Sequence, residues 1–373
     1  MTVEIRKVTT KRELKHFVQF PFSLYRNHPF WLPPLYIDEF NFFKEGKNKA
    51  LNHSDIVLYS AWEDGKMAGR IMGIINRYYN ELKGQKTARF FRYECTNNEE
   101  VSHALISAVE AWAVEKGMTE MIGPFGFSDK DPQGLLITGF DQRAIIIAPY
   151  NHPYYAGLVE KEGYRKQVDL VEYLIPVPEK VPDFYIRIYD RVKRNHNLEC
   201  IEFNKKSELK PYIIPVLRLL NETFSDIFGF YPLDEDEMKK FAADYMMILD
   251  PAFVKVVVDQ GKPVSFFIAI PDLGPALQKA RGRLFPFGIL YLMREMKRTD
   301  YLILMLGGIS EAYQGIGLDV LMGTKMLESA SKRGIKLINS HLELETNVKV
   351  RAEMEKMNGK VCKTYRIYRK ALN

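Results

Sequence analysis

The sequence has few cysteines, and they lie far apart. Among its 373 residues only Cys95, Cys200 and Cys362 are cysteines. Isolated cysteines exclude a disulfide framework and a zinc site built on cysteine pairs. The histidines also lack the spacing of a metal site, so we expect no metal cofactor. A reducing compartment, the cytoplasm, is the expected location.

Long hydrophobic runs are absent as well. The longest, such as 144–150 and 301–308, are far shorter than the roughly 18 apolar residues that cross a bilayer. Residues 1–14 contain no apolar segment of the kind found in secretory signals. Both observations agree with a cytoplasmic protein.

The chain also lacks a concentration of charge. Its 53 Lys and Arg residues exceed its 47 Asp and Glu residues by only six, and they are spread along the sequence. Proteins that bind nucleic acid usually gather basic residues on one face or helix, so we expect no nucleic-acid partner. A modest positive charge suits a small phosphorylated ligand better.

One segment, 276–298, mixes apolar and basic residues. Such a segment could lie on an anionic membrane. Inserted segments more often cover a groove or pack on a neighbouring domain. We therefore favour a covering role, and we expect no membrane partner.

The length exceeds what one hydrophobic core usually supports, and the two halves repeat one pattern. A hairpin, a long helix and a final helix–strand unit occur in each half. The hairpin glycines Gly65 and Gly261 are 196 residues apart, and Gly163 and Gly359 are also 196 residues apart. Equal offsets of this kind predict a duplicated domain.

A third pair of glycines locates insertions in the repeat. Gly117 and Gly334, which end the long helices, are 217 residues apart. The larger offset predicts an added segment at about 273–300 in the second half. The first half must then contain a compensating insertion, which we place at 123–149.

Proline marks the boundary between the halves, with three prolines in residues 175–183. We predict one domain at 1–176, a linker with a bridging helix at 177–198, and a second domain at 199–373. Strands that alternate with helices and hairpins predict an α/β architecture with a mixed sheet.

The turn EAYQGIGLD at 311–319 stands between an apolar run and a helical stretch. The first turn of a helix leaves backbone N–H groups unpaired, and its dipole attracts anions. Glycine lets the backbone approach a ligand closely. The turn could therefore hold a pyrophosphate, with Asp319 capping the helix. A plain strand-to-helix turn that uses glycine only for its geometry is an equal alternative.

The order of strand, Gln-Gly-x-Gly turn, helix, strand, Asn-initiated helix and final strand resembles the GCN5-related N-acetyltransferase (GNAT) superfamily. The resemblance implies two GNAT-like mixed-sheet domains in tandem. The first half has YECTNNEEV at 93–101, without glycine, and is the degenerate lobe. In the second half the resemblance implies that acetyl-CoA or another acyl-CoA is bound by Leu306, Gly307, Gly308, Ile309, Gln314, Gly315, Ile316, Gly317, Leu318, Asp319 and Asn347.

In this family an amine attacks the thioester directly. The resemblance implies backbone N–H donors for the carbonyl oxygen at Gly308 and Ile309, although the glycine pair could equally form a β-bulge. Glu343 and Glu345 are candidate bases that share one strand face with His341. Glu311 is a further candidate base. The alternative is that these groups are polar residues on a solvated surface.

The sequence departs from the family at Asp319, where Gly or Ala is expected, and at Met354, where a tyrosine often protonates the thiolate. Tyr365 and Tyr368 are possible substitutes. We predict an acyl-CoA-dependent N-acyltransferase for a small-molecule or peptide amine, with acetyl-CoA as the expected donor. One alternative is an inactive GNAT-like protein that binds a metabolite or a protein partner. Another is a transferase that uses charged tRNA. The sequence leaves the acceptor amine and the oligomeric state open.

Overall fold

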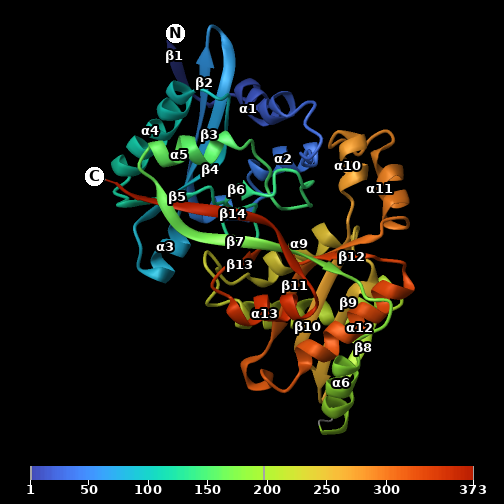
Figure 1. Cartoon of the computed structure of the whole chain (residues 1–373). Helices are drawn as coiled ribbons and strands as arrows, with labels where there is room; N and C mark the ends of the chain where they lie inside the picture. The colour runs from blue at the N-terminus through green and yellow to red at the C-terminus, as the bar shows by residue number, and fades with distance from the viewer. Residues whose placement is uncertain (1, 196–197, 373) are drawn as a thin grey trace.

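A computed structural model of the chain describes residues 2–195 and 198–372. Within them, two α/β halves share one continuous sheet of fourteen strands (Figure 1). The mixed α/β architecture predicted from the sequence is confirmed. Every helix in these two ranges is too short or too polar to span a bilayer.

The first half runs from the N-terminus to the end of a long strand. Its elements are β1 (Val3–Lys7), α1 (Lys11–Leu24), α2 (Tyr36–Phe42), η1 (Lys49–His53), β2 (Ser54–Glu63), β3 (Lys66–Asn76), α3 (Arg77–Lys83), β4 (Thr87–Cys95), α4 (Glu99–Glu115), β5 (Glu120–Gly123), β6 (Leu135–Thr138), α5 (Tyr154–Lys161) and β7 (Arg165–Pro176).

The second half begins with the helix that follows the proline-rich segment. Its elements are α6 (Asp183–Asn195), β8 (Leu198–Glu202), α7 (Lys206–Leu209), η2 (Lys210–Tyr212), α8 (Ile213–Thr223), α9 (Glu235–Met246), η3 (Pro251–Phe253), β9 (Val254–Asp259), β10 (Lys262–Pro271), α10 (Gly274–Ala280), α11 (Gly288–Met296), β11 (Tyr301–Ile309), η4 (Glu311–Tyr313), α12 (Leu318–Lys332), β12 (Leu337–Asn339), β13 (Glu343–Leu344), α13 (Val348–Lys356) and β14 (Lys360–Ala371).

Each half sends its last strand into the other half. The strand order is β1-β2-β3-β4-β5-β14-β7-β12-β11-β10-β9-β8, with β6 also paired to β14 and β13 to β7. β14 of the second half thus lies between β5 and β7, and β7 of the first half pairs with β12. Figure 1 shows the red β14 beside the green β7 where the halves meet. The domain boundary at residue 176 stays a prediction, and residues 196–197 of the predicted linker lie outside the described residues.

The predicted repeat corresponds to equivalent structural positions. Gly65 and Gly261 occupy the β2–β3 and β9–β10 turns with φ of 75° and 80°. Gly117 and Gly334 follow the C-terminal ends of α4 and α12, with φ of 76° and 70°. Left-handed φ values of this size favour glycine, which explains why these glycines marked the repeat.

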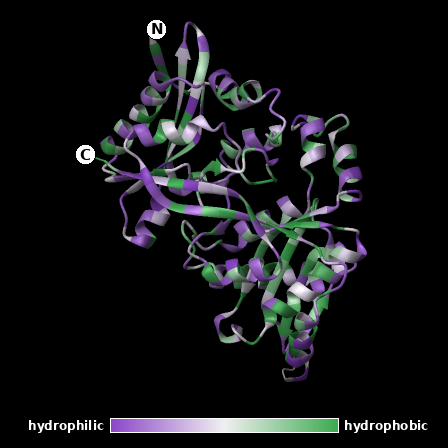
Figure 2. Ribbon diagram, viewed as in Figure 1, coloured by the Kyte–Doolittle hydropathy of each residue, from purple (hydrophilic) through white to green (hydrophobic). Residues whose placement is uncertain are grey.

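Apolar faces pack the helices onto the sheet. α12 and α13 cover one face of the second half, where Leu327 and Met354 pack against Leu302. α8 and α9 cover the opposite face, where Leu220 and Met238 pack with strand side chains. Figure 2 shows mostly apolar strands in the second half and helices in which polar and apolar residues are mixed.

The predicted second-half insertion forms the α10–α11 hairpin between β10 and β11. The side-chain nitrogen of Gln278 donates to the backbone oxygens of Pro29 (2.7 Å) and Trp31 (3.1 Å). The backbone N–H of Tyr36 donates to the oxygen of Gly282 (2.8 Å). α10 therefore packs on the first half.

Candidate functional site

Two parallel strands separate in the middle of the second half. β11 and β12 pair only where 301–303 lie beside 337–339. After that, β11 continues along β10 to Ile309, whereas the chain through β13 follows β7. We call the space between the diverging strands the second-half split. Most of the predicted acyl-CoA residues lie on β11 and the turn after it, and the candidate base Glu343 lies on β13.

The edge of β11 along this split is accessible although the strand is central. Every residue from Leu304 to Ile309 is partly or fully exposed. The N–H of Ser310 donates to Val264 of β10 (2.9 Å), which sets the alternation along the strand. Gly308 therefore directs its backbone groups to β10, and Ile309 directs its own to the split. Of the two predicted donors, only Ile309 has the required direction.

The glycine pair has a packing role. A Cβ at Gly307 would lie 2.9 Å from the Phe267 ring, and a Cβ at Gly308 would lie 2.6 Å from Oγ1 of Thr223. The register shift of β11 against β10 falls at Met305, between Leu304 and Leu306. The alternative of a bulge at the two glycines is therefore wrong in position.

The turn after β11 begins α12 without a side-chain cap. Gly317 (φ 99°) is the N-cap residue, and Gly315 (φ 78°) precedes it. Asp319 lies in the first helical turn and does not cap the helix, contrary to expectation. Among the described residues, the N–H groups of 318–320 find no acceptor. Leu318 and Val320 are buried, so the N–H of the partly exposed Asp319 is the one that an anion could reach.

Helix α6 covers part of this turn. A Cβ at Gly317 would lie 2.9 Å from Val192 and 3.0 Å from Ile188. A Cβ at Gly315 would meet no atom within 4 Å. A ligand can therefore approach at Gly315 and Gln314, which are exposed, but not directly over Gly317. In the sequence, the only indication that α6 packs over this turn was its mixture of apolar and polar residues.

Glu343 is the candidate base with the most unusual surroundings. Its side chain is partly buried, and burial raises the pKa of its carboxyl group to about 8. Its strand partner is Val171, which packs with Leu327 of α12 and Met354 of α13. Because cross-strand partners share a face, Glu343 points to the α12–α13 side of the sheet.

The other two candidate bases have ordinary surroundings. Glu345 forms an ion pair with Lys166 (2.6 Å) and accepts the N–H of Asp169 (3.1 Å). Glu311 is exposed at the start of η4. Glu343 and Glu345 therefore have different surroundings: Glu345 is paired with Lys166, whereas Glu343 forms no ion pair among the described residues.

His341 lies in the irregular segment between β12 and β13. Its φ of 61° breaks the strand alternation, so it does not share the surroundings of Glu343 as predicted. Burial lowers the pKa of His341 to about 4, while nearby Glu172 opposes and Lys363 reinforces that change. Its Nε2 atom is buried and has no partner among the described residues. The imidazole is therefore neutral at physiological pH.

A buried polar network lies beside His341, and sequence reasoning missed it. Oε2 of Glu172 accepts from Lys363 (2.8 Å) and Asn339 (3.1 Å), and Oε1 accepts from the hydroxyl of Tyr365 (2.6 Å). The ion pair between Glu172 and Lys363 is almost fully buried. These residues come from β7, β14 and β12, so the network joins both halves next to the split. Charged residues within apolar strands were the only signal.

The remaining predicted residues have structural contacts. Asn347 is the N-cap of α13 and accepts the N–H of Val350 (3.4 Å). Met354 is buried in the core. The hydroxyl of Tyr365 is bonded to Glu172, and that of Tyr368 donates to Glu160 (3.0 Å), so neither is free to serve the split.

An apolar pocket opens on the other face of the sheet, between α8, α9 and strands β9–β11. Its volume is about 90 Å³, and none of the residues that line it is charged. Met305 and Leu306, at the register shift of β11, form part of its wall. The pocket therefore meets the second-half split at that strand. The other lining residues are Leu209, Tyr212, Ile213, Val216, Leu217, Phe241, Ala242, Tyr245, Met246, Leu249, Val254, Val256, Ile268 and Ile270.

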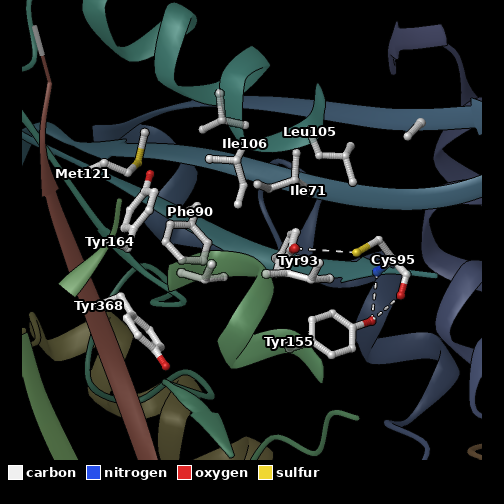
Figure 3. Close-up of a cluster of buried hydrophobic side chains, with 14 of the residues drawn as sticks. Ile71, Phe90, Tyr93, Cys95, Leu105, Ile106, Met121, Tyr155, Tyr164 and Tyr368 are labelled. Atoms are coloured by element: carbon white, nitrogen blue, oxygen red, sulfur yellow. Dashed lines mark hydrogen bonds between the residues drawn. The ribbon is translucent and has the colours of Figure 1, made fainter. Parts of the chain in front are cut away.

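The first half has an equivalent split between β4 and β5, and side chains fill it. The two strands pair only at 87–89 and 120–122. The hydroxyl of Tyr155 accepts the N–H of Cys95 (2.8 Å) and donates to its backbone oxygen (2.9 Å). Figure 3 shows this contact, with Phe90 and Tyr93 nearby. Phe90, Tyr93 and Tyr155 are all buried, so side chains occupy this position in the first half.

Within residues 2–195 and 198–372, no three His, Cys, Asp or Glu side chains are grouped in a way that could hold a metal ion.

Known proteins resemble the chain over almost its whole length. No protein-family model matches it. The Escherichia coli protein YghO is 27% identical over 99% of this chain and 95% of its own length. The bacterial ceramide synthase of Caulobacter vibrioides is 27% identical over 98% of this chain and 96% of its own length.

Two solved structures show the same architecture. A tandem GNAT protein from the clavulanic acid biosynthesis pathway superposes with a TM-score of 0.57 at 11% identity, covering 100% of this chain and 99% of that one. A GCN5-related N-acetyltransferase from Sphaerobacter thermophilus gives a TM-score of 0.52 at 11% identity, covering 100% and 96%. The chain therefore has the tandem GNAT-like fold that its motifs predicted.

Proposed function

We propose that the chain is an acyl-CoA-dependent N-acyltransferase whose active lobe is the second half. The observation that carries the proposal is the second-half split. There an open strand edge, an uncapped helix N-terminus and an isolated carboxyl group lie along one path. The first half, whose split is filled by Tyr155, then has a supporting role.

The backbone of the second half supplies the binding groups. The exposed turn at Gly315 and the unpaired amide of the partly exposed Asp319 suit the pyrophosphate of CoA. The open edge of β11 suits the amide-containing pantetheine arm, which can bond to it like an added strand. The N–H of Ile309 is the proposed donor to the thioester carbonyl oxygen, where negative charge develops.

The reaction forms one bond and breaks one. The amine nitrogen forms a C–N bond with the carbonyl carbon, and the C–S bond breaks. The amine nitrogen loses one proton, and the CoA thiolate gains one, so the reaction releases no net proton. We assign Glu343 to this proton transfer, because a pKa near 8 lets it exist in both forms near neutral pH.

The position of Glu343 favours the leaving group. It points to the α12–α13 side, where the CoA sulfur is expected, and Met354 leaves that side without a tyrosine acid. We therefore propose that protonated Glu343 donates to the thiolate. Glu345 and Glu311 are the remaining candidates for taking a proton from the amine.

The apolar pocket favours a longer acyl chain than acetyl. Its uncharged wall includes Met305 and Leu306, so the first carbons of a chain attached at the split can enter its volume of about 90 Å³. The Caulobacter relative is named a ceramide synthase, and a ceramide is an amide of a fatty acid with a long-chain amine. We propose a fatty acyl-CoA donor and a long-chain amine acceptor, in place of the acetyl donor expected from the family resemblance.

Three observations favour the alternative of an inactive binding protein. The Asp319 carboxylate lies in the first turn of α12, Met354 replaces the usual acid, and α6 covers Gly317. Such a protein could bind a CoA-like metabolite without turnover.

Turnover with acyl-CoA donors of increasing length separates these possibilities. We expect release of free CoA in the presence of a long-chain amine, faster with a fatty acyl chain than with acetyl. CoA itself should raise the melting temperature, because it binds only the folded chain. Thermal stabilisation by CoA without turnover would support the inactive alternative. If the protein shows neither stabilisation nor turnover, both hypotheses are rejected.

A pair of variants tests the acyl pocket. Ala242→Phe fills the pocket, and we expect it to shift the preference towards acetyl-CoA. Ala243→Phe is the matched control, because the neighbouring Ala243 on α9 is exposed. The same chain-length preference in both variants would contradict the proposed acyl site.

A further inference from the structure

The α10–α11 hairpin exposes a group of large apolar side chains. Phe285 is 76% exposed, Phe287 60%, Leu290 62% and Met293 56%. Isolated apolar residues are common on protein surfaces, but these four lie within nine residues of one hairpin. Phe287, Leu290 and Met293 recur every three residues, so they form one stripe along α11. We call these four residues the hairpin tip.

Basic side chains surround the hairpin tip. Residues 276–298 contain six basic residues and one acidic residue, Glu295, a net charge of +5 in a chain whose net charge is +6. All six basic side chains are exposed. The segment therefore combines exposed apolar groups with a concentrated positive charge. The six are Lys279, Arg281, Arg283, Arg294, Lys297 and Arg298.

The positive surface continues into an open groove of about 1090 Å³ between α10 and the first half. Arg26 and Lys66 of the first half face Lys279, Arg281 and Arg283 of the hairpin across it. Among the described residues that line the groove, none is Asp or Glu. An anionic headgroup therefore meets only positive or neutral side chains there.

We propose that the hairpin tip docks this protein on the surface of a bilayer that contains anionic lipids. The four apolar side chains enter the boundary between headgroups and acyl chains, and the surrounding Lys and Arg side chains attract the lipid phosphates. Figure 1 shows α10 and α11 projecting together at the edge of the molecule, where a flat surface can reach them.

The fold explains why the hairpin can present its apolar side chains. α10 is anchored to the first half through Gln278, and Leu277 and Leu292 form a small core between the two helices. Among the described residues, the four side chains of the hairpin tip belong neither to that core nor to any other buried cluster. From the sequence we expected this segment to cover a groove or to pack on the neighbouring domain. The structure shows that α10 packs on the first half while α11 leaves its apolar stripe exposed.

Sedimentation with vesicles tests the docking, and it does not depend on the acyl transfer proposed above. We expect the full chain to sediment with vesicles made of equal parts phosphatidylglycerol and phosphatidylcholine, and much less with phosphatidylcholine alone. Added salt should weaken the binding, because it screens exposed charges.

Two variants of the hairpin separate its apolar and basic contributions. Phe285→Ser with Phe287→Ser should lower the bound fraction at limiting lipid by about tenfold or more, because the variant loses two phenyl rings that enter the bilayer on docking. Arg294→Glu with Lys297→Glu should lower it at least as much on the anionic vesicles. All four positions are exposed, so the variants should keep the melting temperature of the parent chain.

The matched control is Leu82→Ser with Lys86→Glu, which removes an exposed leucine and reverses an exposed charge near α3. Figure 1 places α3 on the opposite side of the molecule from α10 and α11. We expect the control to bind vesicles like the parent chain. Equal loss in the control and the hairpin variants would overturn the proposal. The proposal would also be overturned if the parent chain did not bind anionic vesicles but self-associated through Phe285 and Phe287 in light scattering. The hairpin tip would then be a protein interface.

Discussion

The two halves of the molecule carry the same split, but only one is open. In the first half, the side chain of Asn98 accepts N–H groups from Glu100 (2.9 Å) and Val101 (3.5 Å) at the start of α4. In the second half, the equivalent helix starts at Gly317, which has no side chain to offer. The comparison teaches that the same fold can satisfy its helix N-terminus internally or leave it for a ligand.

Two tyrosines bind the backbone of Cys95 in the first split: Tyr155 accepts its N–H, and both Tyr154 and Tyr155 donate to its oxygen. The offset of 196 residues places Tyr155 at the position of Arg351. Tyr155 turns inward and binds the backbone of Cys95, whereas Arg351 donates to the hydroxyl of Tyr173 (3.0 Å) and the backbone oxygen of Glu345 (2.9 Å). Arg351 therefore supports the wall of the second-half split without entering it.

The largest expected effect is on catalysis, and it follows from changing Glu343, the proposed proton donor at the open split of the second half. If Glu343→Gln removes the proposed proton transfer, kcat should fall by about 10²- to 10⁴-fold. Glu345→Gln, which changes the neighbouring candidate, should have a much smaller effect on kcat. The measurement is the steady-state release of CoA thiol. Equal losses in the two variants would show that Glu343 has no special role.

The pH dependence distinguishes the two roles of Glu343. A group that must be protonated to act makes kcat fall as the pH rises through about 8, and a general base makes kcat rise there. Stability gives an independent check, because the raised pKa means that the folded state holds the proton more tightly. The contribution of Glu343 to the free energy of unfolding should be greatest below about pH 4.3, the usual pKa of Glu. It should decrease as the pH rises towards 8. Glu343→Gln should flatten that decline.

The second effect concerns the strands that the halves exchange. Glu172→Ala leaves Lys363 charged and buried between β7 and β14, and we expect a loss of about 3–5 kcal/mol in the free energy of unfolding. Denaturant unfolding measures it. Asp244→Ala, which removes an exposed partner of Lys240, is the control and should cost less than about 0.5 kcal/mol.

A double variant identifies the cause of that loss. Glu172→Gln with Lys363→Met removes both charges, so it should be clearly more stable than Glu172→Ala. A double variant as unstable as the single variant would show that packing, and not the unpaired charge, holds the exchanged strands.

Local patterns in the sequence were sufficient for the architecture. The glycines at 65, 117, 261 and 334 mark turns and helix ends because their φ values are positive in each half. Helix faces such as Val101, Leu105 and Val109 are buried as their spacing predicts. Such signals depend on neighbouring residues, which is why the elements, the repeat and the insertions could be placed.

The features that depend on distant residues could not be predicted. Glu172, Lys363 and Asn339 meet only because the last strands are exchanged, and no local spacing encodes that pairing. The same holds for α6 over Gly317 and for the filling of the first split by Tyr155. Glu343 was predicted as a candidate, but its raised pKa comes from burial that the sequence does not show.

The third effect tests the closed half. Tyr155→Phe removes the hydroxyl that accepts the N–H of Cys95, while the oxygen of Cys95 keeps its hydrogen bond from Tyr154 (2.8 Å), so we expect a loss of about 1–3 kcal/mol in the free energy of unfolding. The CoA-induced rise in melting temperature should stay unchanged, because the ligand is proposed to bind in the other half. A CoA response that changes in this variant would show that the first split contributes to binding.

The smallest expected effect compares one position in the two halves. Asp319 and Glu100 are both the second residue of their helices, α12 and α4. Each carboxylate interacts favourably with its helix dipole, so Asp319→Asn and Glu100→Gln should destabilise the fold by similar small amounts. Only Asp319 would face the phosphates of CoA.

Asp319→Asn should therefore tighten CoA binding by about two- to fivefold, the equivalent of one such charge at a helix end. Glu100→Gln should leave the affinity unchanged, because Asn98 and not a ligand satisfies that helix. Calorimetric titration with CoA measures both. If the two variants change the affinity alike, the carboxylate acts through the net charge of the protein, and the distinction between an open and a closed helix end loses its support.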